Sequence, residues 1–344
     1  MSLDEGQASV STAGSPPDDG SVRLQVENLQ TYFYTRRGVV KAVDGVSFSL
    51  NGGETLGLVG ESGSGKSMTC LSLVRLVPEP AGKIVGGKIL LDGTDLLEAS
   101  SQEMQQIRGR KISMILQDPM SSLNPVFNIE KQVGEGAKYH LGLKGVPLRE
   151  RVQKLLRNVQ ISAPETRARH YPHQMSGGMR QRMVGAIALS SEPQVLIADE
   201  PTTSLDVTIQ AQYLRLLKEL QREHGFSMIF VTHDFGIVAR VCDRVAVMYA
   251  GKIIETAPTR ELFNNPKHPY TQALMDSLPD PDKEVESLTS IPGQPPSMLD
   301  AGPGCPFAPR CAHAMDICQV EYPPSFTMGT ANHTADCWLH KGDD

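Results

Sequence analysis

The sequence predicts an α/β protein with a mostly parallel central sheet, a helical segment inserted in the middle of the chain and a C-terminal extension. Short apolar runs typical of buried strands alternate with helical patterns. The stretch from about residue 121 to 190 is mostly helical in pattern and is punctuated by prolines. After about residue 256 prolines become frequent and four cysteines appear, so we treat residues 257–344 as a separate extension.

Composition and charge limit the class of protein. The chain has 344 residues, 40% hydrophobic and 21% charged, with a net charge of -6. This balance argues against a nucleic-acid binder that relies on bulk positive charge. No run approaches the roughly 18–20 apolar residues that a membrane-spanning helix needs. We therefore expect no nucleic acid among the partners and, if the protein serves a membrane, a peripheral location.

The N-terminal residues 1–21 do not resemble a secretory signal. They are rich in Ser, Gly, Asp and Pro and lack a basic start followed by an apolar run. We expect this segment to be a disordered leader. The chain should then stay in the cytosol, where thiols are kept reduced, so its six cysteines need a role other than disulfide formation.

The main ordered domain is predicted to span residues 22–256. We expect a helix from about Lys66 to Leu76, directly after a short strand and a glycine-rich loop. Strands are predicted at 23–33, 42–50, 55–59, 88–91, 112–116, 195–198, 228–232 and 245–249.

The loop between the strand at 55–59 and its helix carries the strongest chemical signal. Residues 60–67 read GESGSGKS and fit the pattern G-x-x-x-x-G-K-[ST] without deviation. The backbone N–H groups of Gly60, Ser62, Gly63, Ser64 and Gly65 are expected to surround the phosphates of ATP. Lys66 should reach the β- and γ-phosphates, and Ser67 should bind Mg²⁺.

A pair of acids follows the apolar strand at 195–198. Open α/β sheets bind ligands at the carboxyl ends of their strands. Asp199 is therefore predicted to bind Mg²⁺, directly or through water. Glu200 is the candidate general base that orients the attacking water. The alternative, a solvated acidic turn, is weakened by the phosphate-binding loop in the same chain.

Three further elements strengthen this interpretation. Ser176, Gly177 and Gly178 open a second helix whose start can approach a phosphate, with Ser176 as its N-cap. Gln117 ends the strand at 112–116 and could bind Mg²⁺ or the water. His233 follows the strand at 228–232 and could contact the γ-phosphate. Gln117 and His233 are weak signals when taken singly.

Together these motifs resemble ABC transporter ATPases over about residues 22–340. The resemblance implies a P-loop NTPase (RecA-like) core with an inserted helical subdomain. It also implies that two ATPases pack head to tail, with residues 176–178 of one closing on the ATP of the other. Asp206, in the motif 204–206, would link the two sites, and Gln117 would couple the site to membrane subunits. An aromatic residue, Phe33 or Tyr34, would stack on adenine, and Phe33 is favoured.

Further stretches indicate a branch of that family. The signature reads Met175-Ser176-Gly177-Gly178-Met179, where the usual sequence is L-S-G-G-Q, so its first and last residues differ. The Met in place of Gln resembles the peptide-importer branch. The stretches 116–125, 265–271 and 304–311 are similar to dipeptide and oligopeptide importer ATPases. Nickel and glutathione importers share much of this pattern and stay open as alternatives.

The extension contains a cluster of cysteines that predicts a metal site. Four thiolates with no tight C-x-x-C pair suit a 4Fe-4S cluster better than zinc. The branch resemblance points the same way. Nearby His313, His333 and His340 keep zinc as an alternative, and four unrelated buried thiols are a third. The predicted ligands are Cys305, Cys311, Cys318 and Cys337.

The remaining cysteines, Cys70 and Cys242, lie in helix-like stretches and are predicted to be core residues. The functional hypothesis is the ATP-hydrolysing subunit of an importer for short peptides, on the cytoplasmic face of the membrane. The resemblance implies a second ATPase, a paralogue rather than a copy, together with two permeases and an external solute-binding protein. A soluble ABC ATPase that acts on ribosomes or DNA is disfavoured by the single motif set and the acidic balance.

Overall fold

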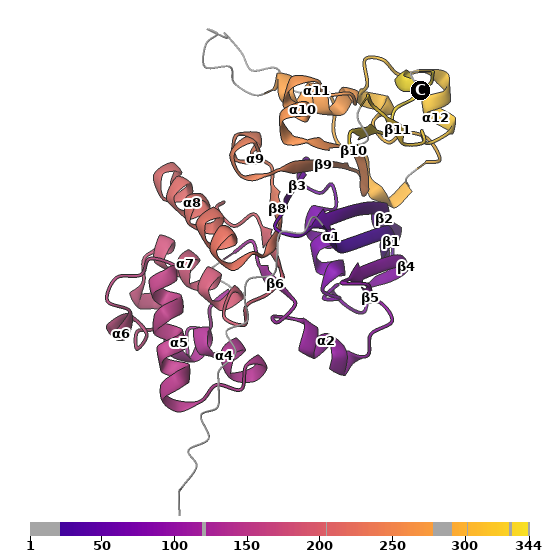
Figure 1. Cartoon of the computed structure of the whole chain (residues 1–344). Coiled ribbons are helices and arrows are strands. Elements are labelled where there is room, and N and C mark those ends of the chain that lie inside the picture. The colour runs from indigo at the N-terminus through magenta and orange to yellow at the C-terminus, as the bar shows by residue number, and fades with distance from the viewer. Residues whose placement is uncertain are drawn as a thin grey trace, which may run out of the picture.

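The computed structural model describes residues 21–118, 122–203, 205–277, 291–300, 302–329 and 332–342. Nearly all of the predicted leader, residues 1–20, lies outside the described residues. So does Ser204, which belongs to the predicted motif 204–206. Figure 1 shows the chain in three regions: two sheets at the centre, helices on one side and a C-terminal region at the end of the larger sheet.

Twelve strands are described, in two sheets. The larger sheet has the order β11-β12-β10-β9-β3-β8-β7-β6, and the smaller has the order β2-β1-β4-β5. The strands are β1 (Val22–Thr35), β2 (Gly38–Asn51), β3 (Thr55–Val59), β4 (Gly82–Leu91), β5 (Thr94–Asp95), β6 (Ile112–Ile115), β7 (Val195–Asp199), β8 (Ser227–Thr232), β9 (Arg244–Tyr249), β10 (Lys252–Pro258), β11 (Phe326–Thr327) and β12 (Thr334–Ala335).

The centre of the larger sheet is parallel, as predicted. Strands β9, β3, β8, β7 and β6 pair in parallel, whereas β10, β11 and β12 add antiparallel pairs at one edge. Every residue of β3, β7 and β8 is buried. Strands covered on both faces are apolar along their whole length, which is why the sequence shows continuous runs here instead of alternation.

The smaller sheet is antiparallel and was not predicted as a separate unit. Strand β1 lies between β2 and β4 and pairs antiparallel with both. The sequence indicated these strands but placed their bounds too narrowly, because most residues at their ends are exposed or partly exposed and do not continue the regular burial of apolar side chains. One face of this sheet contributes Leu24, Val26 and Leu29 to a core that it shares with the larger sheet.

Helices cover the other face of the larger sheet and fill the segment between β6 and β7, as Figure 1 shows. Helix α1 ends at Leu73, three residues before the predicted end. The described helices are α1 (Lys66–Leu73), α2 (Ser101–Ile107), α4 (Ile129–His140), α5 (Gly145–Asn158), α6 (Pro164–Arg167), α7 (Gly177–Ala188), α8 (Val207–His224), α9 (Phe235–Val241), α10 (Thr259–Asn264), α11 (Pro269–Asp276) and α12 (Asp316–Val320), with short 3-10 turns that include η3 (Ala308–Arg310).

The two faces of the larger sheet pack into two hydrophobic cores. Leu196 and Ala198 of β7 belong to a core with residues of α4, α5, α7, α8 and α9. Val195 and Ile197, which alternate with them along β7, belong to the other core, with α1 and the smaller sheet. Cys70 and Cys242 are buried, as predicted, although Cys242 is an extended residue just after α9. In the part of the chain that the structure describes, no helix is long and apolar enough to cross a membrane.

The C-terminal region is joined to the larger sheet by hydrogen bonds. Strand β10 pairs with β12, so the predicted boundary near residue 256 falls inside a strand of the sheet. Behind this pairing, the buried side chains of Glu255 and His333 form a contact of 2.8 Å between Oε1 and Nε2. Glu255 also accepts hydrogen bonds from the backbone N–H groups of Lys267 and His268.

Candidate functional site

The glycine-rich loop and the residues predicted to bind Mg²⁺ or to catalyse hydrolysis lie at the carboxyl ends of neighbouring parallel strands. The pairing partners Val59 and Thr232, at the ends of β3 and β8, precede the glycine-rich loop and His233. Asp199 ends β7, and Glu200 follows it. Because parallel strands end at the same edge of a sheet, these groups are brought together although they are far apart in the sequence.

The glycine-rich loop has a conformation that only glycine adopts easily at its critical positions. Gly60 has φ +149°, and a Cβ there would collide with the backbone oxygen of Met248. Gly65 has φ +106°, and a Cβ there would collide with the backbone oxygen of Ala42. Gly63 has φ +79° but borders open space, with no atom within 4 Å of an added Cβ. The loop is therefore packed on one side and open on the other.

Lys66 is held inside this loop by the loop's own backbone. Its Nζ donates hydrogen bonds to the carbonyl oxygens of Gly60 (2.8 Å) and Glu61 (2.9 Å). The side chain is 5% exposed. Burial lowers the pKa of Lys66, against the opposing effect of the nearby Glu200 and Asp199 carboxylates. The ammonium group is thus positioned at the start of α1, where Gly65 is the N-cap and provides no side-chain hydrogen bond.

Two of the three predicted Mg²⁺ ligands, Ser67 and Asp199, are in direct contact, whereas Gln117 contacts Glu200. Ser67 Oγ donates a hydrogen bond of 3.2 Å to Asp199 Oδ1. Burial raises the pKa of Asp199, against the hydrogen bond from Ser67 and the charge of Lys66. A hydroxyl and a carboxylate oxygen are donors of the kind that Mg²⁺ prefers, so this pair fits the predicted ion.

Glu200 is the centre of a polar network. Its Oε2 accepts hydrogen bonds of 3.0 Å each from Gln117 Nε2 and Thr203 Oγ1. Its Oε1 lies 3.3 Å from Nδ1 of His233. The backbone of Glu200 has φ +45°, an uncommon conformation for a non-glycine residue that is often found at functional sites. Three groups from separate loops thus orient one carboxylate.

Thr203 was missed by the sequence analysis. It is exposed and donates to the side chain of Glu200 from three positions later in the chain. The only signal in the sequence was its place three residues after the second acid, which any turn residue would share. Its role follows from the turn geometry alone.

Two other predicted elements face solvent. Ser176 caps α7, where its Oγ accepts a hydrogen bond from Met179 N, and both Ser176 and Gly177 are exposed. Asp206 caps α8 by accepting a hydrogen bond of 3.0 Å from Ile209 N. The neighbouring Val207 is 80% exposed. These segments are ordered within the chain by their caps, with their outer faces uncovered.

Phe33, the predicted adenine contact, lies within the smaller sheet. Phe33 is half-buried in β1, where it pairs with Val40 of β2 and Gly82 of β4. An added Cβ at Gly82 would lie 2.8 Å from its ring, so the ring packs against β4. Tyr34, the alternative, is 50% exposed. The adenine role of Phe33 stays a prediction.

The four cysteines of the extension line one small cavity. The cavity measures about 20 Å³, and His268 and His313 also line it. Burial raises the pKa of the Cys305, Cys311 and Cys337 thiols. Among the described residues, no group of three or more Cys, His, Asp or Glu side chains is arranged to hold a metal ion. His333 pairs with Glu255 instead, and His340 contacts the Lys267 carbonyl.

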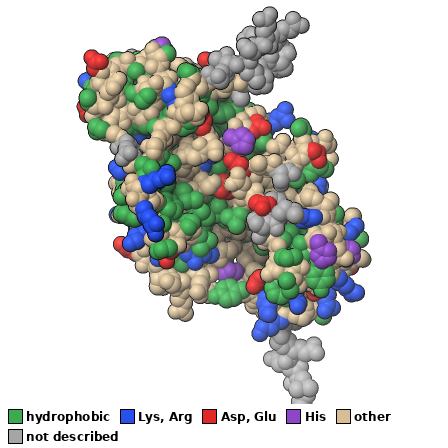
Figure 2. Space-filling view, turned by 180° about the vertical axis from the view of Figure 1, so that it is seen from behind, with side chains coloured by type: hydrophobic (Ala, Val, Ile, Leu, Met, Phe, Trp, Pro, Cys, Tyr) green, Lys and Arg blue, Asp and Glu red, His purple; other side chains and the backbone are tan. Residues whose placement is uncertain are grey.

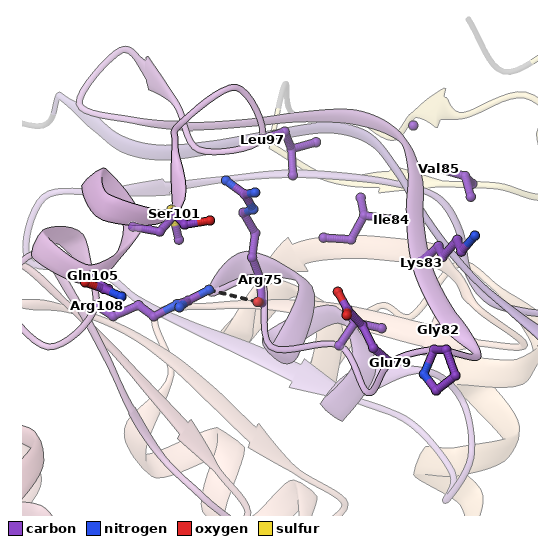
Figure 3. Close-up of a pocket in the computed structure, with 14 residues that line it drawn as sticks. Arg75, Glu79, Gly82, Lys83, Ile84, Val85, Leu97, Ser101, Gln105 and Arg108 are labelled. Carbon is purple, nitrogen blue, oxygen red and sulfur yellow. Dashed lines mark hydrogen bonds between the residues drawn. The ribbon is translucent and has the colours of Figure 1, made fainter.

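A larger cavity of about 880 Å³ lies between β4, α2 and the loop after α1 (Figure 3). Arg75 and Arg108 line it, and Arg108 donates a hydrogen bond of 2.9 Å to the Arg75 carbonyl. None of the predicted site residues lines this cavity.

Figure 2 views the molecule from behind Figure 1 and shows His and acidic side chains close together near the middle of that face.

Comparison with known proteins gives consistent matches. Residues 43–203 match the family described as ABC transporter, and residues 254–318 match the family described as oligopeptide/dipeptide transporter, C-terminal region. The chain is 50% identical to the dipeptide transport ATP-binding protein DppD of Bacillus subtilis, over 92% of this chain and 94% of the relative. It is 47% identical to the oligopeptide transport ATP-binding protein AppD of the same organism, over 93% of this chain and 98% of the relative.

Solved structures show the same fold. The dimeric ATP-binding cassette MJ0796, bound to ADP and phosphate, matches with a TM-score of 0.62 at 26% identity, over 69% of this chain and 99% of that one. The cbiO1 protein of Clostridium perfringens, part of the cbiONQ transporter complex, matches with a TM-score of 0.61 at 30% identity, over 71% of this chain and 91% of that one.

Proposed function

The chain belongs to the ABC transporter ATPases of the dipeptide and oligopeptide importer branch, and from this premise we propose how its site works. It is the ATP-hydrolysing subunit of an importer for di- or oligopeptides. The observation that carries the mechanism is the network around Glu200, which lies beside the contact between Ser67 and Asp199.

ATP binds with its phosphates in the loop 60–67. The open side of the loop at Gly63 and the backbone N–H groups at the start of α1 suit a phosphate chain. Lys66 leaves the carbonyl oxygens that hold it and pairs with the β- and γ-phosphates. Ser67 and Asp199, with Gln117 nearby, would hold Mg²⁺, which neutralises charge on the phosphates.

Glu200 accepts a proton from the water that attacks the γ-phosphate. The hydrogen bonds from Gln117 and Thr203 occupy one carboxylate oxygen. The other oxygen faces His233, whose ring is the group that we assign to the γ-phosphate. Orientation of the base by three neighbours supports its role, because general-base catalysis depends on geometry within hydrogen-bonding reach.

The site is completed by a second ATPase. Ser176, Gly177 and Gly178 are exposed or partly exposed, so they are available to bind the ATP of a partner. Asp206 sits next to the exposed Val207 at the start of α8, which supports its assignment to the link between the two sites. We assign the partner to a paralogue of this chain rather than a second copy.

The chain works at the cytoplasmic face of the membrane with two permeases and an external solute-binding protein. We assign residues 22–256 to the nucleotide-binding domain, with a helical subdomain at about 121–190 that contains α4, α5, α6 and α7. Residues 257–344 form the extension. Phe33 is our candidate for the adenine contact.

The cavity lined by the four cysteines is our candidate for a 4Fe-4S cluster, with zinc as the alternative. The presence of all four cysteines in the lining of one cavity supports a shared ligand. The volume of about 20 Å³ accommodates little more than one water-sized sphere, so a cluster would require the thiols to move outward. Iron and acid-labile sulfide would be measured in protein prepared without oxygen. Absence of both would exclude the cluster, and zinc in their place would support the alternative.

A pull-down of the tagged chain from native membranes tests the transport function. We expect two multi-span permeases and a second ATPase to be identified by mass spectrometry. A co-purified binding protein for nickel or glutathione would redirect the substrate within the branch. Recovery of ribosomal or DNA-repair proteins without any permease would refute the importer function. The ATPase chemistry is tested separately, by phosphate release from Mg-ATP with Lys66→Ala as the inactive control.

A further inference from the structure

A charged side chain of the C-terminal extension reaches the phosphate-binding loop. Arg310, at the end of η3, forms two hydrogen bonds with the carboxylate of Glu61, the second residue of the loop. The distances are 2.8 Å from Nη1 to Oε2 and 3.1 Å from Nη2 to Oε1. The two residues are 249 positions apart in the sequence. This two-point geometry fixes direction as well as distance.

The guanidinium group of Arg310 is itself held firmly. Its side chain is 5% exposed. Nε donates to the Pro292 carbonyl at 2.9 Å, and Nη1 also donates to Tyr249 Oη at 3.2 Å. Its Cζ lies 5.9 Å from the ring centres of both Tyr249 and Phe307. Residues of the extension and of β9 therefore set the position from which Arg310 pairs with Glu61.

Glu61 is restrained at its backbone as well as at its side chain. Its N–H donates a hydrogen bond of 2.9 Å to Tyr270 Oη, from α11. Its carbonyl oxygen accepts the hydrogen bond from Lys66. Arg310 thus holds the side chain of the same residue whose backbone carbonyl holds the phosphate-binding lysine. A loop fixed in its binding conformation before ATP arrives loses less entropy when ATP binds.

We propose that Arg310 is a positioning residue for the phosphate-binding loop, and that through Glu61 the C-terminal extension sets the affinity of the site for Mg-ATP. This inference rests on the proposed function, because it requires Mg-ATP to bind in the loop 60–67. Arg310 does not contact the reacting atoms. It acts by holding the first turn of the loop through the carboxylate of Glu61.

The test compares full-length variants in Mg-ATP binding and steady-state hydrolysis. Arg310→Met removes the paired charge but keeps most of the side-chain volume. We expect the Kd and KM for Mg-ATP to rise about tenfold, whereas kcat changes less than about twofold. Arg310→Lys retains a single-point contact and should give an intermediate Kd. Arg260→Met, on an exposed residue of α10 in the same extension, is the matched control and should leave both values unchanged.

A double-mutant cycle separates positioning from mere tethering of the extension. Glu61→Gln retains an acceptor oxygen but removes the charge pair. If Arg310 acts through Glu61, Arg310→Met raises the KM in the wild-type background and has little further effect in the Glu61→Gln background.

Equal increases in both backgrounds would overturn the inference. So would an unchanged KM together with a lower melting temperature. Failure of the wild-type chain to bind Mg-ATP would overturn the proposed function and this inference together, whereas normal binding that Arg310→Met does not alter would overturn this inference alone.

Discussion

Gln117 donates a hydrogen bond of 3.0 Å from its Nε2 to Oε2 of Glu200. The contact joins a residue that follows β6 to the acid that follows β7, two neighbouring parallel strands. The family resemblance assigns Gln117 to coupling with membrane subunits, and our mechanism assigns Glu200 to proton transfer. A movement of Gln117 would therefore alter the orientation of the base directly.

Replacement of Glu200 by Gln should separate ATP binding from hydrolysis. The amide cannot accept a proton from water at neutral pH, so we expect kcat to fall by at least about 10²-fold while the Kd for Mg-ATP changes little. Phosphate release and equilibrium nucleotide binding measure the two effects. Glu219→Gln, on an exposed face of α8, is the matched control. Normal turnover by the Glu200 variant would show that the base has been wrongly assigned.

Replacement of Gln117 by Glu should change the pH profile of hydrolysis. Two carboxylates at hydrogen-bonding distance cannot both ionise easily, so the apparent pKa of the pair rises. Glu200 must be ionised to accept a proton. As the solution is acidified, the variant should therefore lose activity at a higher pH than the wild type does. We expect the acidic limb of kcat to move up by about one pH unit or more. Gln117→Ala removes only the hydrogen bond to the carboxylate and should shift this limb less than Gln117→Glu does. An equal shift in both variants would contradict the argument.

Alanine at Gly60 and at Gly63 should have unequal effects on stability. Both glycines have positive φ, but only at Gly60 would the Cβ collide with backbone, at the Met248 carbonyl. We expect Gly60→Ala to lower the free energy of unfolding by about 2 kcal/mol or more, and Gly63→Ala by about 1 kcal/mol. Urea denaturation measures both values. Equal losses would indicate that φ strain, rather than the collision, dominates.

Replacement of Ser176 by Ala should impair hydrolysis more than it impairs ATP binding by the isolated chain. The hydroxyl is exposed and is assigned to the ATP held by the partner, so we expect kcat of the two-ATPase assembly to fall at least about tenfold. Ser176 also caps α7, and that loss alone costs about 1 kcal/mol. Ser100→Ala removes the equivalent cap of α2 and controls for it. Similar activity loss in both variants would argue for a structural effect only.

Stability should fall on mild acidification because of His268. Burial lowers its pKa from 6.5 to about 4. Between these values the unfolded chain binds a proton that the folded chain does not, so stability is complete above about pH 6.5 and declines as the pH falls towards 4. We expect a loss of about 2 kcal/mol at pH 5 from this group.

Urea denaturation at pH 7.5 and pH 5 measures this loss. In His268→Asn the difference between the two pH values should shrink, since Asn does not titrate. His173→Asn, at an exposed position, should retain the full difference. An unchanged difference in the His268 variant would assign the acid sensitivity to other groups.

Much of the candidate site could be proposed from the sequence, because the motifs that define it are local. A phosphate-binding loop needs glycines at fixed positions between a strand and a helix, so the pattern of residues 60–67 is recognisable from the sequence. The parallel strands were equally clear, because burial on both faces makes them continuous apolar runs. The separate antiparallel sheet was not predicted, since strand pairing between β1, β2 and β4 leaves no pattern within any one of them.

The sequence alone determined which groups are the candidates for binding ATP and Mg²⁺, because those groups lie within short motifs. Only the tertiary structure decided which side chains meet. Thr203 orients Glu200 through the shape of one turn, and Arg310 reaches Glu61 across 249 residues. Such contacts depend on how the folded segments pack. The sequence around an arginine or a threonine does not show which residue its side chain will contact.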